Sequence, residues 1–307
     1  MDINEKIAWL KEKLRGGVAP AMATPVLADG MTVNTAVVPF LVDFLLNAGS
    51  SGLFVGGTTG EGVLLSDGER LRLHETAVTA SNGRAPVILH VGTNNLASTI
   101  ALAQHAVEVG ADAIAVVTPF FYGMHDDGLA AYYHTVAAAV PTMPLLLYDI
   151  PQMAVNGISP ALLTRLGREI PSLAGIKSSR ADAQIVRQLI DAAPERIVFL
   201  VGNEAVALGL LGLGADGLIS GLSTAVPEPY VAMTAAFFRG DMAEAQKQQR
   251  WINALLGQLP NGARIGAIKQ ILTGRGIEMG TAVPPRPMPE VDVWPAIRPL
   301  LAQIHQA

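Results

Sequence analysis

The stretch PVILHVGTNNLASTIALAQHAVEVGADAIAVV, from Pro86 to Val117, decides the fold class of this chain of 307 residues. Its beginning, Pro86–Val91, and its end, Ala113–Val117, are dominated by apolar residues, and between them Leu96–Val109 has apolar residues at helical spacing. Apolar runs without polar alternation are typical of strands covered on both faces, as in parallel sheets. Val-Gly-Ala-Asp ends the helical part as a helix stop. The stretch therefore predicts a strand–helix–strand unit of a parallel sheet.

The same alternation continues along most of the chain. The further strands that it predicts are Val18–Thr24, Gly52–Val55, Leu145–Asp149, Ala174–Lys177, Val198–Val201 and Gly217–Ile219. The further connecting helices are Val33–Asn47, Asp67–Ser81, Gly128–Ala139, Pro160–Arg168, Ala183–Ala193 and Ala205–Leu213. Eight successive β/α units favour an α/β fold of the closed type, the (β/α)8 TIM barrel. A doubly wound open sheet is the alternative, but it needs a glycine-rich nucleotide loop where this chain has Ala23-Thr24-Pro25.

The chain continues well beyond the eighth strand. The helices predicted there are Pro227–Arg239, Met242–Leu259, Ile265–Thr273 and Val293–Gln306. A barrel needs only the first, so the others form a helical C-terminal extension, in which the proline-dense segment 283–289 (VPPRPMP) is an extended connector. We therefore expect an N-terminal helix over residues 1–15, the barrel over 16–240 and the extension over 241–307.

Composition argues against several classes of function. The formal net charge is −5 without clusters of basic residues, which argues against nucleic acid as a partner. The absence of cysteine excludes disulfides and thiolate metal sites. Residues 1–15 lack the apolar centre of a signal peptide, and no apolar stretch approaches the ~20 residues that cross a bilayer. We expect a soluble cytoplasmic protein with no membrane partner.

One lysine differs in its setting from the others. Five fall in predicted helices near the two ends of the chain, where we expect solvated side chains: Lys6, Lys11, Lys13, Lys247 and Lys269. Lys177 instead ends the apolar strand Ala174–Lys177, and lysine is rarely buried unless it is paired or used. A desolvated lysine has a lowered pKa, so its neutral amine can attack a ketone. Because barrel enzymes place catalytic groups at the carboxyl ends of strands, Lys177 is the leading catalytic candidate; a lysine that only extends to solvent is the alternative.

Two further strand ends carry polar groups. The loop Gly56–Glu61 (GGTTGE) follows the second strand, and its amides and the hydroxyls of Thr58 and Thr59 suit an anion the size of a carboxylate. No Gly-Lys-Ser/Thr follows, so it is not a phosphate-binding P-loop. Tyr148 lies near the end of the fifth strand, where a phenol can relay protons. A tight turn and a packed aromatic side chain are the alternatives.

Taken together, these segments resemble the class I pyruvate-dependent aldolase family, which includes dihydrodipicolinate synthase, N-acetylneuraminate lyase and the 2-keto-3-deoxygluconate aldolases. The resemblance is carried by Gly57–Glu61, Tyr148–Pro151 and Gly175–Lys177 and extends to Thr118–Phe121 and Gly214–Gly217. It implies that Lys177 forms a Schiff base with a 2-keto acid such as pyruvate. By the same resemblance, Tyr148 would shuttle protons, and Thr58 and Thr59 would hold the carboxylate of the keto acid.

This chemistry needs no metal and no other cofactor. The histidines are scattered, without a pair of ligands at metal-binding spacing: His74, His90, His105, His125, His134 and His305. His90, at the end of the third strand, could face the site, and a buried, hydrogen-bonded histidine is the other interpretation. We therefore expect a site without metal.

Departures from the family pattern bear on the second substrate. Dihydrodipicolinate synthases usually carry an arginine where this chain has Met153, and a relay tyrosine where it has Phe121 beside Tyr122. The asparagine of the tyrosine motif is Asp149 here. We therefore expect a lyase, an aldolase or dehydratase, that acts on a 2-keto-3-deoxy sugar acid, with pyruvate as product or donor and an aldehyde as partner. A dihydrodipicolinate synthase condensing pyruvate with aspartate semialdehyde, and a non-catalytic regulatory protein, are the alternatives.

The loops after the last strands add candidates for contacts to substrate. Gly202, Asn203 and Glu204 fall where sugar-acid aldolases of the family contact hydroxyl groups, and Ser220 is a further polar candidate after the eighth strand. Ordinary loop polarity is the alternative. The resemblance also implies a homotetramer, a dimer of dimers, in which the loop after the fourth strand reaches the neighbour's site with Phe121 or Tyr122.

Overall fold

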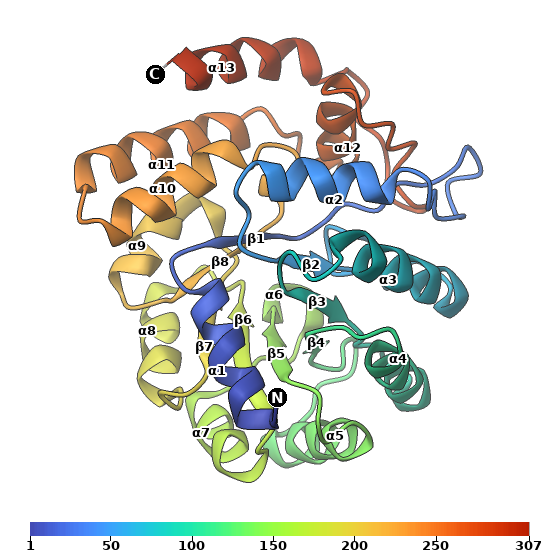
Figure 1. Ribbon diagram of the computed structural model, residues 1–307, viewed down its shortest axis with the longest axis vertical. Helices are drawn as coiled ribbons and strands as arrows, with labels where there is room; N and C mark the ends of the chain where they lie inside the picture. The colour runs from blue at the N-terminus through green and yellow to red at the C-terminus, as the bar shows by residue number, and fades with distance from the viewer. Residues whose placement is uncertain (307) are drawn as a thin grey trace.

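The computed structural model describes residues 1–306, with side chains through residue 304 (Figure 1). Within them, parallel strands pair in the order β1-β8-β7-β6-β5-β4-β3-β2, and a bridge between Ala21 and Phe54 joins the first strand to the second. The predicted (β/α)8 barrel is therefore confirmed, and the open sheet is wrong. The strands are β1 (Val18–Pro20), β2 (Leu53–Val55), β3 (Val87–His90), β4 (Ala113–Val117), β5 (Leu145–Asp149), β6 (Leu173–Ser178), β7 (Val198–Val201) and β8 (Gly217–Ser220).

Helices surround the strands on the outside of the barrel (Figure 1). They are α2 (Val38–Asn47), α3 (Asp67–Ser81), α4 (Leu96–Glu108), α5 (Asp126–Ala139), α7 (Pro160–Glu169), α8 (Ala183–Ala192), α9 (Ala207–Gly212) and α10 (Glu228–Phe238). Every residue of β1–β8 is buried, which explains the apolar runs that revealed them. Polar residues cap the starts of α3, α4, α7 and α8, as Ser66 does for α3 by accepting from the N–H of Glu69.

Three predicted boundaries were wrong because tertiary contacts override local pattern. The first strand ends at Pro20 rather than Thr24, since the Ala23 N–H and the Thr24 hydroxyl bond to Thr224 and to the Gly60 carbonyl. Residues 33–37 precede α2, because the Val33 N–H donates to the Glu69 carboxylate. The helix predicted over 205–213 begins instead as a 3-10 turn, Glu204–Val206. The structure also contains a short helix, α6 (Pro151–Ala154), that the sequence did not predict.

The N-terminal helix α1 (Ile3–Leu14) closes the amino end of the barrel. Asp2 caps it, and its carboxylate accepts from the N–H groups of Asn4 and Glu5. Ile7, Leu10 and Leu14 are buried in one cluster with the residues that fill the barrel interior, Phe54 among them. The opposite, carboxyl end of the barrel is not covered by this helix and is therefore where we look for an active site.

The C-terminal extension consists of α11 (Met242–Leu256), α12 (Arg264–Gly274) and α13 (Trp294–Gln306). Figure 1 shows α11 beside α10 and α12 close to α2, with α13 outermost. Residues 283–289 contain neither helix nor strand, but they are not extended throughout as predicted, because a turn at 284–286 is closed by the bond from the Arg286 N–H to the Val283 carbonyl. The extension thus covers one side of the barrel.

Lys269 on α12 is fully buried, so its predicted solvated position is wrong. Its Nζ lies 2.7 Å from Oε2 of Glu61, and both side chains are 0% exposed. The same Nζ donates to the Thr281 carbonyl at 2.6 Å, and the Val283 N–H donates to Oε1 of Glu61 at 2.9 Å. Burial lowers the pKa of Lys269, while Glu61 acts to raise it. One ion pair thus joins the loop after β2 to α12 and to the connector.

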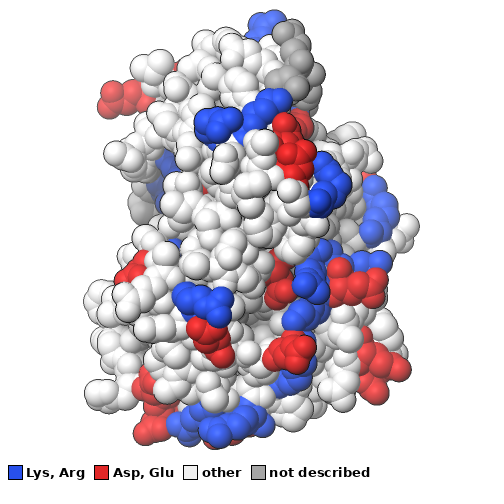
Figure 2. All heavy atoms as spheres, turned by 90° about the vertical axis from the view of Figure 1, so that its left-hand side faces the viewer, with Lys and Arg blue, Asp and Glu red and all other residues white. Residues whose placement is uncertain are grey.

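Helix length and surface charge bear on two of the predicted absences of a partner, membrane and nucleic acid. In residues 1–306 no helix is long and apolar enough to cross a bilayer. The face in Figure 2 carries Lys and Arg beside Asp and Glu rather than a broad patch of one sign. Arg187 and Asp191, four residues apart on α8, form an exposed ion pair. This face therefore offers no basic field for a polyanion.

Lys269→Ala leaves the Glu61 carboxylate buried without its cation. We expect it to lower the free energy of unfolding by about 3–5 kcal/mol, whereas Glu61→Gln/Lys269→Met, which removes both charges, should lose much less. Urea unfolding at one protein concentration, followed by circular dichroism, measures both. Lys247→Ala, on the more exposed α11, is the control. A Lys269→Ala protein as stable as the wild type would contradict the role assigned to this pair.

Candidate active site

A pocket of about 420 Å³ opens at the carboxyl end of the barrel. Lys177 from β6, Tyr148 from β5, and Thr58 and Thr59 from the loop after β2 all line it. These are the four residues that the sequence singled out for chemistry. The parallel register explains their meeting, because Tyr148 lies directly beside Lys177 in the β5–β6 pair.

The Lys177 amine is held between two aromatic rings. Its Nζ lies 4.2 Å from the ring centre of Phe54 and 4.1 Å from that of Tyr148, and the residue is 4% exposed. Burial lowers the pKa of this amine, while Tyr148 and then Glu204 act to raise it. The lowered pKa increases the fraction of neutral, nucleophilic amine near neutral pH. A Cβ added at Gly202 would lie 2.4 Å from Oγ of Ser179, so glycine there lets the loop after β7 pass close to the end of β6, next to Lys177.

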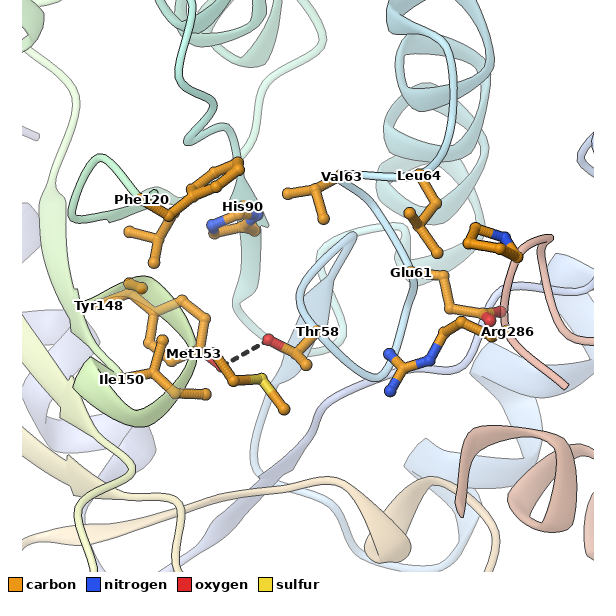
Figure 3. Close-up of a pocket in the computed structure, with 13 residues that line it drawn as sticks. Thr58, Glu61, Val63, Leu64, His90, Phe120, Tyr148, Ile150, Met153 and Arg286 are labelled. Atoms are coloured by element: carbon orange, nitrogen blue, oxygen red, sulfur yellow. Dashed lines mark hydrogen bonds between the residues drawn. The ribbon is translucent and has the colours of Figure 1, made fainter. Parts of the chain in front are cut away.

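The Tyr148 hydroxyl has a partner that the sequence did not reveal. It lies 2.9 Å from Oγ1 of Thr58, within hydrogen-bond distance, as the dashed line in Figure 3 marks. Its ring packs edge-on against Phe54 and His90, at centroid distances of 5.8 and 5.6 Å. Packing therefore holds Tyr148 against the amine, and the hydroxyls of Tyr148 and Thr58 offer two exchangeable protons next to each other.

The Gly56–Glu61 loop is packed tightly against the barrel. The Thr24 hydroxyl donates to the Gly60 carbonyl at 2.6 Å, and a Cβ added at Gly60 would meet the Met22 carbonyl oxygen at 2.8 Å. Glu61 adopts a left-handed conformation with φ 56° and is held by Lys269. The loop therefore presents Thr58 and Thr59 from a fixed backbone.

Asp149 departs from the family pattern and has a structural explanation. Its carboxylate is fully buried and accepts from Nε and Nη2 of Arg180 at 2.7 and 3.0 Å. The Ser178 hydroxyl and the Ile158 N–H donate to it as well, at 2.9 Å each. Asp149 thus ties the ends of β5 and β6 together beside the site, with Arg180 as its counter-charge.

The loop after β7 lines the pocket, but the carboxylate of its Glu204 is already bonded to protein groups. Gly202, Asn203 and Glu204 all line the pocket, and Glu204 is 7% exposed. Oε2 of Glu204 pairs with the Arg264 guanidinium. Oε1 accepts from the Ser220 hydroxyl, the Leu222 N–H and the Tyr230 hydroxyl. Glu204 therefore orders its surroundings before any substrate binds.

Ser220 and Tyr122 do not line the pocket of Lys177. Ser220 is 1% exposed and donates to Glu204, so it is behind the pocket wall rather than among the described lining residues. Tyr122 is 72% exposed and packs edge-on against Phe121, which is 76% exposed with a φ of 76°. A contact of either aromatic ring with a neighbour's site stays a prediction.

A second pocket, of about 300 Å³, adjoins the first at Tyr148 and Thr58. Its walls are largely apolar, with Phe120, Ile150 and Met153 at one side (Figure 3). His90 also lines it, 2% exposed, with Nδ1 lying 3.1 Å from the Gly56 carbonyl oxygen. Burial, and then the charges of Arg70 and Lys177, lower the pKa of His90. Both interpretations of His90 hold in part, since it is buried and hydrogen-bonded and also borders the site.

The described residues contain no group of three or more His, Cys, Asp or Glu side chains that could hold a metal ion. The His305 side chain lies outside the part described. A site that works without metal or cofactor stays a prediction.

Two arginines at the pocket were missed by the sequence reasoning. Arg264, at the start of α12, and Arg286, in the connector, both line the pocket of Lys177. Both belong to the extension, far from the barrel motifs in sequence. The one signal for Arg286 was its position as the only charged residue in the segment 283–289.

Comparison with known proteins agrees with the barrel fold and shows the family. Residues 14–295 match the model of the dihydrodipicolinate synthetase family. A 4-hydroxy-tetrahydrodipicolinate synthase of Listeria welshimeri is 34% identical over 91% of this chain and 93% of its own. The wild-type sialic acid aldolase of Ruminococcus gnavus superposes with a TM-score of 0.91 at 27% identity, over 96% of this chain and 99% of the aldolase. The prophage protein YagE of E. coli K12, solved with pyruvate, gives 0.87 at 28% identity, over 95% and 99%.

The family match covers nearly the whole chain, and the observed barrel agrees with it. Members of this family are pyruvate-dependent lyases that use a lysine Schiff base. The chain therefore belongs to the dihydrodipicolinate synthetase family and is an enzyme of this lyase class.

Proposed function

We propose that this enzyme cleaves a 2-keto-3-deoxy sugar acid to pyruvate and an aldehyde, through an imine on Lys177. The observation that carries the proposal is the buried Lys177 amine beside the Tyr148–Thr58 hydroxyl pair. One solved structure of the Ruminococcus gnavus aldolase, with a TM-score of 0.91, is of its catalytic lysine mutant, which supports a lysine in this role. The polar wall of Asn203 and Gln152 suits a hydroxylated substrate.

The first step forms the imine. The neutral Lys177 amine attacks the C2 carbonyl, and the resulting carbinolamine loses its oxygen as water after protonation. Tyr148 is placed to give and take these protons, and Thr58 to pass them on, since their oxygens are 2.9 Å apart. The product is an iminium, whose positively charged nitrogen makes the former carbonyl carbon, C2, an acceptor of electrons.

The second step breaks the carbon–carbon bond. Removal of the proton from the C4 hydroxyl lets the C3–C4 bond break, and its electron pair moves to C3 while the iminium becomes an enamine. C4 leaves as the aldehyde. Protonation of the enamine at C3 and addition of water then release pyruvate and free Lys177. Tyr148 is the acid and base nearest to the amine, so it serves both steps.

Thr59 and the amides of the 56–61 loop are the proposed carboxylate site. Thr58 shares its hydroxyl with Tyr148, which leaves Thr59, 8% exposed at the pocket wall, as the freer donor. An added Cβ at Gly221 would lie 2.8 Å from Oγ1 of Thr59, so glycine there keeps that hydroxyl accessible. The carboxylate would then orient C2 toward Lys177.

A dihydrodipicolinate synthase is the second candidate, favoured by the name of the Listeria welshimeri relative. Against it stands Met153, an apolar side chain at the pocket where such synthases usually have an arginine. Turnover of pyruvate with aspartate semialdehyde, and with no other aldehyde, would decide for the synthase. Because the family consists of enzymes, the non-catalytic alternative is not retained.

The assembly and the compartment remain predictions. The outward-facing Phe121 and Tyr122 suit a contact with a second copy, as a homotetramer built from dimers would provide. Sedimentation velocity would measure the state. The cytoplasm remains the predicted compartment.

Pyruvate with borohydride should leave a stable reduced adduct on Lys177, because reduction traps the imine. Mass spectrometry of peptides locates it, and Lys177→Ala should abolish it. The peptide that contains Lys247 serves as the internal control and should stay unmodified. An adduct on another lysine, or none, would overturn the proposal.

Tyr148→Phe should slow turnover by about 10²–10⁴-fold, because it removes the general acid and base but little volume. Circular dichroism would verify that the variant is folded. A rate near that of the wild type would exclude the relay.

The rate of adduct formation with pyruvate should rise with pH to an inflection below 10.5, because burial lowers the pKa of Lys177. Tyr148 acts to raise that pKa, so in Tyr148→Phe the inflection should move to lower pH. Trapping reactions that are stopped at successive times, at a series of pH values, give the rate at each pH and hence the inflection. An inflection at or above the value of free lysine would contradict the desolvation argument.

A further inference from the structure

The C-terminal extension contributes a guanidinium to the pocket of Lys177. Arg286 lines both the polar pocket and the adjoining apolar one, together with Thr58, Tyr148 and Met153. Figure 3 shows its guanidinium turned toward the space between Thr58 and Met153, below Glu61. Nothing in the proposed imine chemistry uses this charge.

The charge of Arg286 is uncompensated. Among the described residues its guanidinium has no ion pair and no hydrogen bond, whereas every acid that lines the two pockets is paired with another cation. Glu61 is paired with Lys269, and Glu204 with Arg264. The pocket therefore has one cationic group in excess, in addition to Lys177.

The backbone that carries Arg286 is held in place. The Val283 N–H donates to Glu61, which is itself fixed by Lys269, and the Arg286 N–H donates to the Val283 carbonyl at 3.0 Å. The side chain is half-buried against the pocket rather than extended into solvent. A guanidinium in such a setting is preorganised for a planar anion, which it can bind through two N–H groups at once.

We propose that Arg286 binds a terminal anion, carboxylate or phosphate, at the end of the substrate away from Lys177. This deepens the proposed function and rests on it, since the imine at Lys177 defines which end is distal. The aldehyde released would then carry a carboxylate or a phosphate. The neighbouring side chains of Ile150 and Met153 are apolar, so they offer the guanidinium no competing polar partner.

Arg264 takes a supporting role in this arrangement. Its pairing with Glu204 cancels the one acidic charge that faces the polar pocket from the β7 loop. An anion that reaches Arg286 therefore meets no unpaired carboxylate. The substrate class is thus narrowed from sugar acids in general to 2-keto-3-deoxy acids with a second anionic group.

Borohydride trapping with matched 2-keto acids tests the proposal without knowledge of the natural aldehyde. 2-Oxoglutarate is compared with 2-oxopentanoate, and 2-oxoadipate with 2-oxohexanoate, so that each pair differs only in a terminal carboxylate or methyl group. Condensation of pyruvate with glyceraldehyde 3-phosphate against glyceraldehyde covers phosphate. The variants are Arg286→Gln and Arg286→Lys, with Arg298→Gln, an exposed arginine of α13, as the matched control.

We expect the wild type to favour the anionic member of at least one pair by about 10–100-fold in half-saturating concentration or KM. Arg286→Gln should remove that preference and leave trapping of pyruvate unchanged, Arg286→Lys should restore part of it, and Arg298→Gln should keep it. A preference in the pairs of keto acids indicates a carboxylate, and a preference for glyceraldehyde 3-phosphate over glyceraldehyde indicates a phosphate.

Two outcomes would overturn the inference. One is a wild type that traps pyruvate on Lys177 but shows no preference for the anion in any pair. The other is an Arg286→Gln protein that weakens pyruvate or the methyl-ended acids as much as the anionic ones. Absence of any adduct on Lys177 in the wild type is a different result, because it refutes the proposed function itself.

Discussion

The buried ion pair of Glu61 and Lys269 holds together the parts of the molecule from which the site is made. It lies where both side chains are inaccessible to water, and it joins three segments that are distant in sequence: the loop after β2, helix α12 and the connector. A buried pair of this kind contributes less to net stability than to geometry, because desolvation offsets much of its attraction. Its value here is that the loop of Thr58 and the segment of Arg286 have one common anchor.

The reactivity proposed for Lys177 follows from a second constraint, the burial of its amine against two aromatic rings. The rings of Phe54 and Tyr148 cover the amine on two sides, and this burial lowers its pKa. Tyr148 also limits the effect, since its contact with the amine acts in the opposite direction. The same residue therefore tunes the nucleophile and, through Thr58, supplies the path for protons.

The strands were the most predictable part of this protein. β4, β5 and β7 have the bounds that their apolar runs predicted, because a strand covered on both faces needs apolar residues at every position. Segments without that constraint were predicted less well. Residues 33–37 look helical in isolation, yet the Glu69 carboxylate captures the Val33 N–H and delays the helix. Lys269 has the local setting of a surface residue and is buried only because Glu61 meets it.

The sequence by itself determined the closed barrel and the positions of Lys177, Tyr148, Thr58 and Thr59 at strand ends, because these depend on local periodicity and on residue type at a known edge of the sheet. Only the tertiary structure decided what surrounds them. The Thr58–Tyr148 contact, the engagement of Glu204 by Arg264, and the approach of Arg286 all join segments tens to hundreds of residues apart. No periodicity encodes such pairings, since they arise from how the extension packs on the barrel.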